Sequence, residues 1–239
     1  MRIPPPFELT GAPQERDYTS PDFKLSSLTT ITLVHDYLCP WCWIGFLHAR
    51  RLQEEFGVTF DWRGAELVPP SMNYTPAPRK EPDPNEPPKP KGRFDLFVES
   101  EGYVMPEPRP AFVSTHNALL AAEWVWLEAQ DGFERYNEAV YRAYWEQRRD
   151  IADVEVLAGI ADSVGLSGAA LADSVRDGRY ENHVVPFDDT AYSIGIRHVP
   201  TFLFNAEELL AEAPYTDLAR ATERFLIRVE RIRQRQQGG

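Results

Sequence analysis

Two cysteines, Cys39 and Cys42, are the only thiols in this chain of 239 residues, and they lie in the tetrapeptide Cys-Pro-Trp-Cys. A dithiol at this spacing can exchange with a disulfide. One thiolate attacks a disulfide sulfur to give a mixed disulfide, and the second thiol then attacks that bond and releases the product. The spacing therefore points to thiol–disulfide exchange as the chemistry of the chain.

The residues around the pair predict a strand-to-helix junction. The apolar, β-branched run 31–34 precedes it, and apolar residues recur afterwards on one helical face: Ile44, Leu47, Leu52 and Phe56. Pro40 then falls at the first helical position, where its missing N–H costs nothing. Cys39 would lie at the helix N-terminus, where free backbone N–H groups and the helix dipole stabilise a thiolate. We therefore predict that Cys39 is the nucleophile and Cys42 the resolving thiol.

The pair has two other interpretations. A Cys-x-x-Cys pair can be half of a zinc or iron–sulfur site, but a closed site usually needs four ligands and the chain has no second cysteine pair. The histidines do not supply a His-x3–5-His pair; they are His35, His48, His116, His183 and His198. Two inert core cysteines are the second alternative. The prediction is a redox pair with no metal and no cofactor beyond the Cys39–Cys42 disulfide.

Composition narrows the class of partner. The net charge of −12 disfavours nucleic acids and anionic membranes, because both select for Lys and Arg. No apolar run is long enough to cross a bilayer, and the first thirty residues lack the features of a signal peptide. We therefore expect a cytoplasmic protein. In a reducing compartment a close dithiol is more often catalytic or sensing than structural.

The first part of the chain predicts a βαβ unit. A strand is expected over 30–36, a helix over 40–56 that ends at Gly57, and a second strand over 58–63. This places the dithiol at the C-terminal end of the first strand, where open α/β sheets bind their ligands.

Two segments carry no predicted core element. Residues 1–28 are polar and turn-rich, and we expect an N-terminal arm that lies over the domain or is partly disordered. Residues 69–110 contain twelve prolines in 42 residues, which predicts a solvated connector. Within it, the apolar patch 94–97 predicts one amphipathic turn.

Residues 111–194 predict an inserted helical domain. Five amphipathic helices are expected: one marked by 119–127, one by 133–144, one by 154–164, one capped by Ser167 and running to Arg176, and one over 180–194 that bends at Pro186. Their apolar surface exceeds what they can bury among themselves, so some should pack on the sheet.

The β pattern returns near the C-terminus. A strand over 201–204, a turn at 205–207 and a strand over 209–211 precede a final helix with Thr216 as its N-cap. Residues 29–68 and 195–239 would then form one domain. The element order is β-α-β, a helical insertion, and β-β-α, which predicts an α/β fold class.

Both halves together resemble the DsbA-like group of the thioredoxin superfamily, and within it the FrnE-like branch. The resemblance rests on Asp-Tyr-Leu-Cys-Pro-Trp-Cys-Trp-Ile-Gly at 36–45, Leu-Val-Pro-Pro at 67–70, Tyr-Arg-Ala-Tyr-Trp at 141–145 with Arg-Asp-Ile-Ala-Asp at 149–153, and Gly-Ile-Arg-His-Val-Pro-Thr-Phe at 195–202. It implies a thioredoxin-like fold with an all-helical insertion between the second and third core strands. It also implies a cis peptide bond before Pro200 that faces the dithiol.

The resemblance adds candidate site residues to the two cysteines. Supporting roles are implied for Pro40, Trp41, Val199 and Pro200, and Asp36 and His198 are further candidates. The pair Arg197-His198 departs from relatives, which commonly have glycine-like residues there. The segment 205–215 also looks shorter than the usual hairpin.

We predict a protein disulfide oxidoreductase that acts on protein or small-molecule thiols and disulfides. Its direction depends on the reduction potential of the pair. Glutathione as co-substrate, or a thioredoxin-type reductant, would be its partner. A first alternative is a glutathione-dependent isomerase or transferase on a small aromatic substrate, like the hydroxychromene-carboxylate isomerases and kappa-class transferases, which typically have serine in place of the first cysteine. A second is a non-catalytic interaction or metal-holding module.

Overall fold

A five-stranded sheet organises the protein, as seen in a computed structural model that describes residues 15–75 and 90–237. Its strands are β1 (Ile31–His35), β2 (Phe60–Glu66), β3 (Val185–Pro186), β4 (Thr201–Leu203) and β5 (Leu209–Ala211), in the order β3-β2-β1-β4-β5. Strand β1 is parallel to β2 and antiparallel to β4, and β5 is antiparallel to β4. This topology is the thioredoxin-like α/β fold that the sequence predicted.

Strand β1 lies at the centre of the sheet. All five of its residues are buried, the polar Thr32 and His35 included, as expected for a central strand of a sheet that helices cover on both faces. Its register aligns Ile31 with Phe60 and Leu33 with Phe202. The chain leaves β1 directly toward the dithiol.

Eight α-helices are found in the described residues. They are α1 (Pro40–Phe56), α2 (Arg93–Ser100), α3 (His116–Glu128), α4 (Phe133–Trp145), α5 (Val154–Ser163), α6 (Gly168–Arg176), α7 (Asp189–Ser193) and α8 (Tyr215–Gln237). Short 3-10 turns occupy Pro70–Met72, Gln130–Gly132 and Glu181–His183. None of these described helices combines the length and apolar composition that a bilayer crossing requires.

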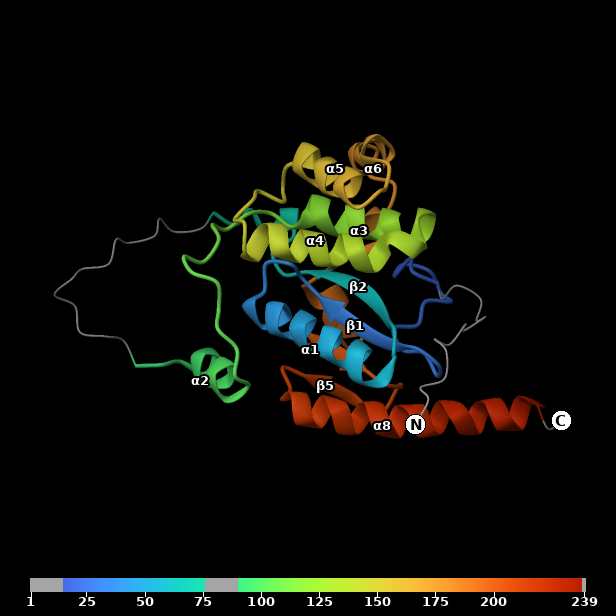
Figure 1. Ribbon diagram of the computed structural model, residues 1–239. Helices are drawn as coiled ribbons and strands as arrows, with labels where there is room; N and C mark the ends of the chain where they lie inside the picture. The colour runs from blue at the N-terminus through green and yellow to red at the C-terminus, as the bar shows by residue number, and fades with distance from the viewer. Residues whose placement is uncertain (1–14, 76–89, 238–239) are drawn as a thin grey trace.

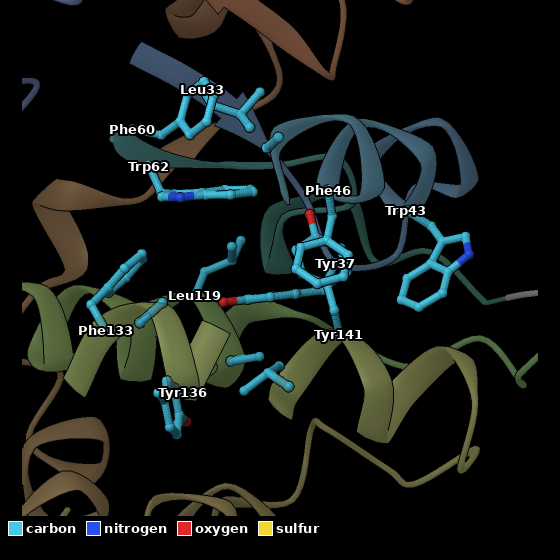
Figure 2. Close-up of a cluster of buried hydrophobic side chains, with 14 of the residues drawn as sticks. Leu33, Tyr37, Trp43, Phe46, Phe60, Trp62, Leu119, Phe133, Tyr136 and Tyr141 are labelled. Carbon is cyan, nitrogen blue, oxygen red and sulfur yellow. The ribbon is translucent and has the colours of Figure 1, made fainter. Parts of the chain in front are cut away.

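The helices form layers around the sheet (Figure 1). Helices α3 and α4 lie on one side of β1 and β2, with α5 and α6 beyond them, while α8 lies at the opposite end of the molecule and packs against α1. Apolar side chains from β1, β2 and α1 meet those of α3 and α4 in one continuous core, as Figure 2 shows for Trp62, Leu119 and Tyr141. The inserted helices therefore pack on the sheet, as their apolar surface predicted.

Several predicted boundaries are confirmed. Helix α1 begins at Pro40 and ends at Phe56, and Gly57 adopts φ 66° while its N–H donates to the carbonyl of Gln53. The side chain of Ser167 caps α6 by accepting from the N–H of Ala170. The hairpin of β4 and β5 also lies where the sequence placed it.

The predicted fifth inserted helix, over 180–194, is wrong. This segment contains a 3-10 turn, the two-residue strand β3 and the short helix α7. Val185 pairs with Ala65 in β2 and Pro186 with Glu66, because proline lacks the N–H a helix would use but is tolerated on an edge strand. The predicted N-cap Thr216 is likewise inside α8, which starts one residue earlier and directs two N–H groups at the carbonyl of Pro214.

Candidate active site

The dithiol lies at the N-terminus of α1. Cys39 is the N-cap, with extended backbone angles (φ −74°, ψ 122°), and Pro40 follows at the first helical position. The carbonyl of Cys39 accepts from the N–H of Trp43 at 3.1 Å. Both thiols are free, and Cys39 is 6% exposed whereas Cys42 is 1% exposed. Cys39 is therefore the more accessible of the two, although it is recessed.

The loop before β4 faces Cys39. The Sγ of Cys39 donates to the carbonyl oxygen of Val199 at 3.5 Å. The Val199–Pro200 peptide bond is cis, as the resemblance implied. The ring of Pro200 packs on α1 at Gly45, where an added Cβ would lie 2.9 Å from Pro200 Cβ and Cγ. A side chain at Gly45 would therefore push the loop away from the dithiol.

Cys42 is enclosed on the inner side of the pair. Its Sγ accepts from the backbone N–H of Asp36 at 3.5 Å. Burial raises the pKa of Cys42 well above its usual range, and a hydrogen bond with Cys39 adds to the effect. Cys42 is thus protonated at neutral pH and needs a proton acceptor before it can act as a nucleophile.

Asp36 is a fully buried carboxylate next to Cys42. Its oxygens accept from the N–H groups of Leu38 at 3.0 Å and Leu67 at 2.7 Å, and from the side chain of Thr115. Burial raises the pKa of Asp36 to about 6, although these hydrogen bonds oppose the shift. Asp36 therefore changes charge close to neutral pH, and Thr115 brings the start of α3 against the site.

A second polar group continues from Thr115 toward the surface. His116 Nδ1 lies 2.9 Å from Glu66 and its Nε2 3.2 Å from Glu181. The hydrogen bond to Glu66 raises the pKa of His116 to about 9 even though burial opposes it, so the ring is a cation at neutral pH. In the described part of the chain, no three His, Cys, Asp or Glu side chains are grouped so that they could hold a metal ion.

Trp41, between the two cysteines, is covered by α2. Its ring centroid lies 5.1 Å from that of Phe94 and 4.8 Å from that of Phe97, and the guanidinium of Arg93 stacks on it at 4.8 Å. The sequence predicted one amphipathic turn here, inside a solvated connector. The structure shows two full helical turns that pack on the dithiol segment.

The sequence-predicted residues thus divide into two sets. Cys39, Cys42, Asp36 and the Val199–Pro200 pair come together at the end of α1. The side chain of His198 is instead exposed, and its carbonyl accepts from Thr201 at 2.6 Å. Sequence reasoning did not identify Thr115, His116 or Arg93 as parts of the site, because each reaches it through contacts distant in sequence. The one local signal was for Gly45, inside the motif that follows the cysteines.

Comparisons with known proteins agree with this topology. The chain is 27% identical over 184 residues to YwbO of Bacillus subtilis (strain 168), described as an uncharacterized protein, and the match covers 72% of this chain and 85% of YwbO. The cytosolic disulfide reductase DsbM of Pseudomonas aeruginosa, solved with GSH, has a TM-score of 0.53 and 18% identity over 85% of this chain and 99% of DsbM. A 2-hydroxychromene-2-carboxylate isomerase has a TM-score of 0.58 and 17% identity over 82% of this chain and 96% of its own.

At these identities the two solved structures establish the fold. The family itself is established by a sequence model, that of the DSBA-like thioredoxin domain, which matches residues 30–222. That range includes the dithiol, the inserted helices, the cis-proline loop and the start of α8. The chain therefore belongs to the DSBA-like thioredoxin domain family.

Proposed function

We propose that the protein is a thiol–disulfide oxidoreductase that works through a mixed disulfide on Cys39. One observation carries the proposal: Cys39 caps α1 with its Sγ 3.5 Å from the carbonyl of Val199, while Cys42 is buried behind it beside Asp36. The two thiols thus have different environments: Cys39 is the more accessible one, and Cys42 is enclosed until a mixed disulfide forms. This asymmetry suits a nucleophile and a resolving thiol.

In the first step the Cys39 thiolate attacks one sulfur of a substrate disulfide. A bond forms between Cys39 Sγ and that sulfur, the substrate disulfide breaks, and the other substrate sulfur leaves as a thiolate. The backbone of Val199 lies beside Cys39 and can pair with an extended substrate segment, as an added strand does at a sheet edge. Val199 and Pro200 would thus orient the disulfide toward Cys39.

In the second step Cys42 attacks Sγ of Cys39. The mixed disulfide breaks, the substrate sulfur leaves as a thiolate, and a Cys39–Cys42 disulfide remains. We assign Asp36 as the group that takes the proton from Cys42, because its charge acts on Cys42 and its pKa of about 6 leaves it ionised at neutral pH. The released proton then has an acceptor inside a site from which water is largely excluded.

A reductant must return the Cys39–Cys42 disulfide to the dithiol for the next turnover. Glutathione or a thioredoxin-type protein would supply the two electrons, and the structural similarity to DsbM, solved with GSH, supports glutathione as the first to test. We propose that this cycle runs in the cytoplasm as a reduction. The direction follows from the reduction potential of the pair against that of the glutathione pool.

The test measures disulfide reduction with glutathione as the electron source, together with the reduction potential of the pair in glutathione buffers. We expect Cys39→Ser to abolish the reaction and Cys42→Ser to accumulate a mixed disulfide that mass spectrometry locates on Cys39. Adducts on Cys42 in the Cys39→Ser variant would reverse the assigned roles. If Cys42→Ser instead turned over a small aromatic electrophile with glutathione, the isomerase or transferase alternative would replace this proposal.

A further inference from the structure

Helix α2 is a wall on one side of the dithiol, and it comes from the proline-rich connector rather than from the sheet. Figure 1 shows it beyond the N-terminal end of α1. Phe94 and Phe97, one turn apart, both pack on the ring of Trp41, and Arg93 covers the ring as well. Trp41 is consequently half-buried, although it lies between the two cysteines.

Charged contacts hold this wall in place at both ends. Arg93 pairs with Glu212 at 2.6 Å, and the backbone N–H of Glu212 donates to the carbonyl of Pro200 at 3.2 Å. Just after the helix, Glu101 accepts from the N–H of Tyr215 at 2.8 Å and lies 3.1 Å from His48 of α1. The same residues that fix α2 therefore connect it to the cis-proline loop and to α1 and α8.

The two faces of α2 differ in chemistry. Phe94, Phe97 and the buried Val98 point inward, whereas the outward positions are exposed and mostly polar: Arg93, Asp95, Leu96, Glu99 and Ser100. A folded protein substrate would need an apolar, accessible surface beside the nucleophile, since interface cores are depleted of charge. Here the ring of Trp41, which lies between the two cysteines in sequence, is already packed against Phe94 and Phe97, and the outer face of α2 carries charged side chains.

We propose that α2 is a specificity-determining wall that restricts access to Cys39 to narrow disulfides. Helix α2 covers the Trp41 ring beside the dithiol, so a disulfide reaches Cys39 from the Val199 side. Small-molecule disulfides and extended peptide segments fit this approach, whereas a disulfide on the surface of a folded domain is excluded. This inference deepens the proposed function and rests on Cys39 being the nucleophile.

The test compares two mixed disulfides of thionitrobenzoate that differ in carrier size. One carrier is glutathione, and the other is a small folded protein with a single surface cysteine. In a Cys42→Ser background, the Cys39 thiolate attacks the carrier sulfur, the carrier–Cys39 disulfide forms, and thionitrobenzoate leaves as a coloured thiolate. Its release rate therefore reports the attack on each carrier without the resolving step.

The variant Phe94→Ser/Phe97→Ser removes both aromatic contacts, and Leu96→Ser is the matched control because Leu96 is 55% exposed on the same helix. Loss of two aromatic pairs should raise the rate with the folded carrier by about tenfold or more and leave the glutathione rate within about twofold. Leu96→Ser should change neither rate. Arg93→Gln removes the pair with Glu212 and the stack on Trp41 but keeps Phe94 and Phe97, and it should change the rates in the same direction by less.

The outcomes separate the two proposals. If thionitrobenzoate is released from both carriers and neither α2 variant changes the ratio of the rates, the wall is wrong while the proposed function stands. Equal release rates from the folded carrier and the glutathione carrier in the protein with α2 unchanged would also contradict the proposed role of α2. No release from either carrier would overturn the role of Cys39 and, with it, this inference.

Discussion

Two buried carboxylates in this protein have opposite charge behaviour. Asp36, beside the dithiol, accepts hydrogen bonds from neutral N–H and O–H groups, and burial raises its pKa to about 6. Burial alone would also raise the pKa of Glu123 in α3, but the guanidinium of Arg16 outweighs it and lowers the pKa to about 2. One nearby cation thus separates a group that titrates near neutral pH from one that stays charged.

The difference assigns the two carboxylates different tasks. Arg16 is 4% exposed and makes a two-pronged pair with Glu123, at 2.6 and 2.7 Å, while it also pairs with Asp61 and donates to the carbonyl of Trp62 at 2.6 Å. The N-terminal arm therefore joins β2 to α3 through one buried side chain. Asp36 has no such cation among its hydrogen-bond partners in the described residues, so its proton affinity is available for chemistry.

The largest effect is expected from removing Arg16, the cation that pairs with Glu123. Arg16→Ala removes the cation that Glu123 and Asp61 share and leaves Arg63, at 2.9 Å from Asp61, as the remaining guanidinium; breaking a buried pair in this way costs about 3–5 kcal/mol. Denaturant unfolding at pH 7 measures the loss. The control is Arg220→Ala, because Arg220 is exposed on α8 and its pair with Asp217 at 3.7 Å should be worth less than about 0.5 kcal/mol.

The pH dependence identifies Glu123 as the cause. In the wild-type protein the folded pKa of Glu123 is about 2, below its usual 4.5, so its contribution to stability is present above pH 4.5 and is lost as the pH falls toward 2. Without Arg16, burial is opposed only by His183 and Arg63, so the folded pKa of Glu123 rises and the variant should lose less stability than the wild type as the pH falls from 4.5 toward 2. Parallel stability profiles for wild type and Arg16→Ala would contradict this account.

The variant Asp36→Asn tests the role of the carboxylate that has no paired cation. If Asp36 accepts the proton of Cys42, this variant should release a mixed disulfide from Cys39 about 10²-fold more slowly at pH 8, a typical loss for a general base. The wild-type rate should rise as the pH passes about 6 and then level off, whereas the variant rate should not follow this titration. Stopped-flow tryptophan fluorescence can follow the step because Trp41 and Trp43 flank Cys42.

The matched control for Asp36→Asn is the first step. The attack of Cys39, measured in a Cys42→Ser background, should change by less than about threefold, since Asp36 is assigned to Cys42 alone. An equal slowing of both steps would mean that Asp36 supports the shape of the loop through Leu38 and Leu67 rather than accepting a proton.

The sequence predicted several helix boundaries correctly because their signals are local. Pro40 at the start of α1, Gly57 in the left-handed conformation at its end and Ser167 as a cap all act within a few residues. The prediction of Cys39 as N-cap and of the β4–β5 hairpin followed from such short-range patterns. The core strand β1 could be recognised in the same way from its apolar run.

The parts that the sequence did not predict depend on distant contacts. Arg16 lies 107 residues from Glu123, and nothing near it distinguishes it from an ordinary charged residue of a polar arm. In β2, Asp61 and Arg63 alternate with apolar residues, yet both are buried, because Asp61 pairs with Arg16 of the distant N-terminal arm as well as with Arg63. The packing of α2 on Trp41 also depends on residues far apart in sequence, because Phe94 and Phe97 lie more than fifty positions after Trp41.

The smallest effect is expected from His116→Gln, which tests whether a more distant cation also affects the pKa of Asp36. His116 holds a positive charge against Glu66, and the negative charge of Glu66 contributes to the raised pKa of Asp36. The folded pKa of His116 is about 9, above its usual 6.5, so its stabilisation is fully present below pH 6.5 and is lost as the pH rises through 9. After allowance for its partial exposure to solvent, we expect a loss of about 1 kcal/mol at pH 6 and almost none at pH 10.

The same variant should also affect the dithiol. With the cation removed, the charge of Glu66 is less compensated, so the pKa of Asp36 should rise further and the midpoint of the resolving step should move above about pH 6 by a few tenths of a unit. Unfolding free energies and the rate profile can be measured on one preparation. A stability loss that is equal at pH 6 and pH 10, with an unmoved midpoint, would show that His116 acts through packing and hydrogen bonding. A shift in both would show that the largely buried His116–Glu66 ion pair changes the pKa of Asp36, so that Asp36 has no cation among its own contacts but still responds to nearby charge.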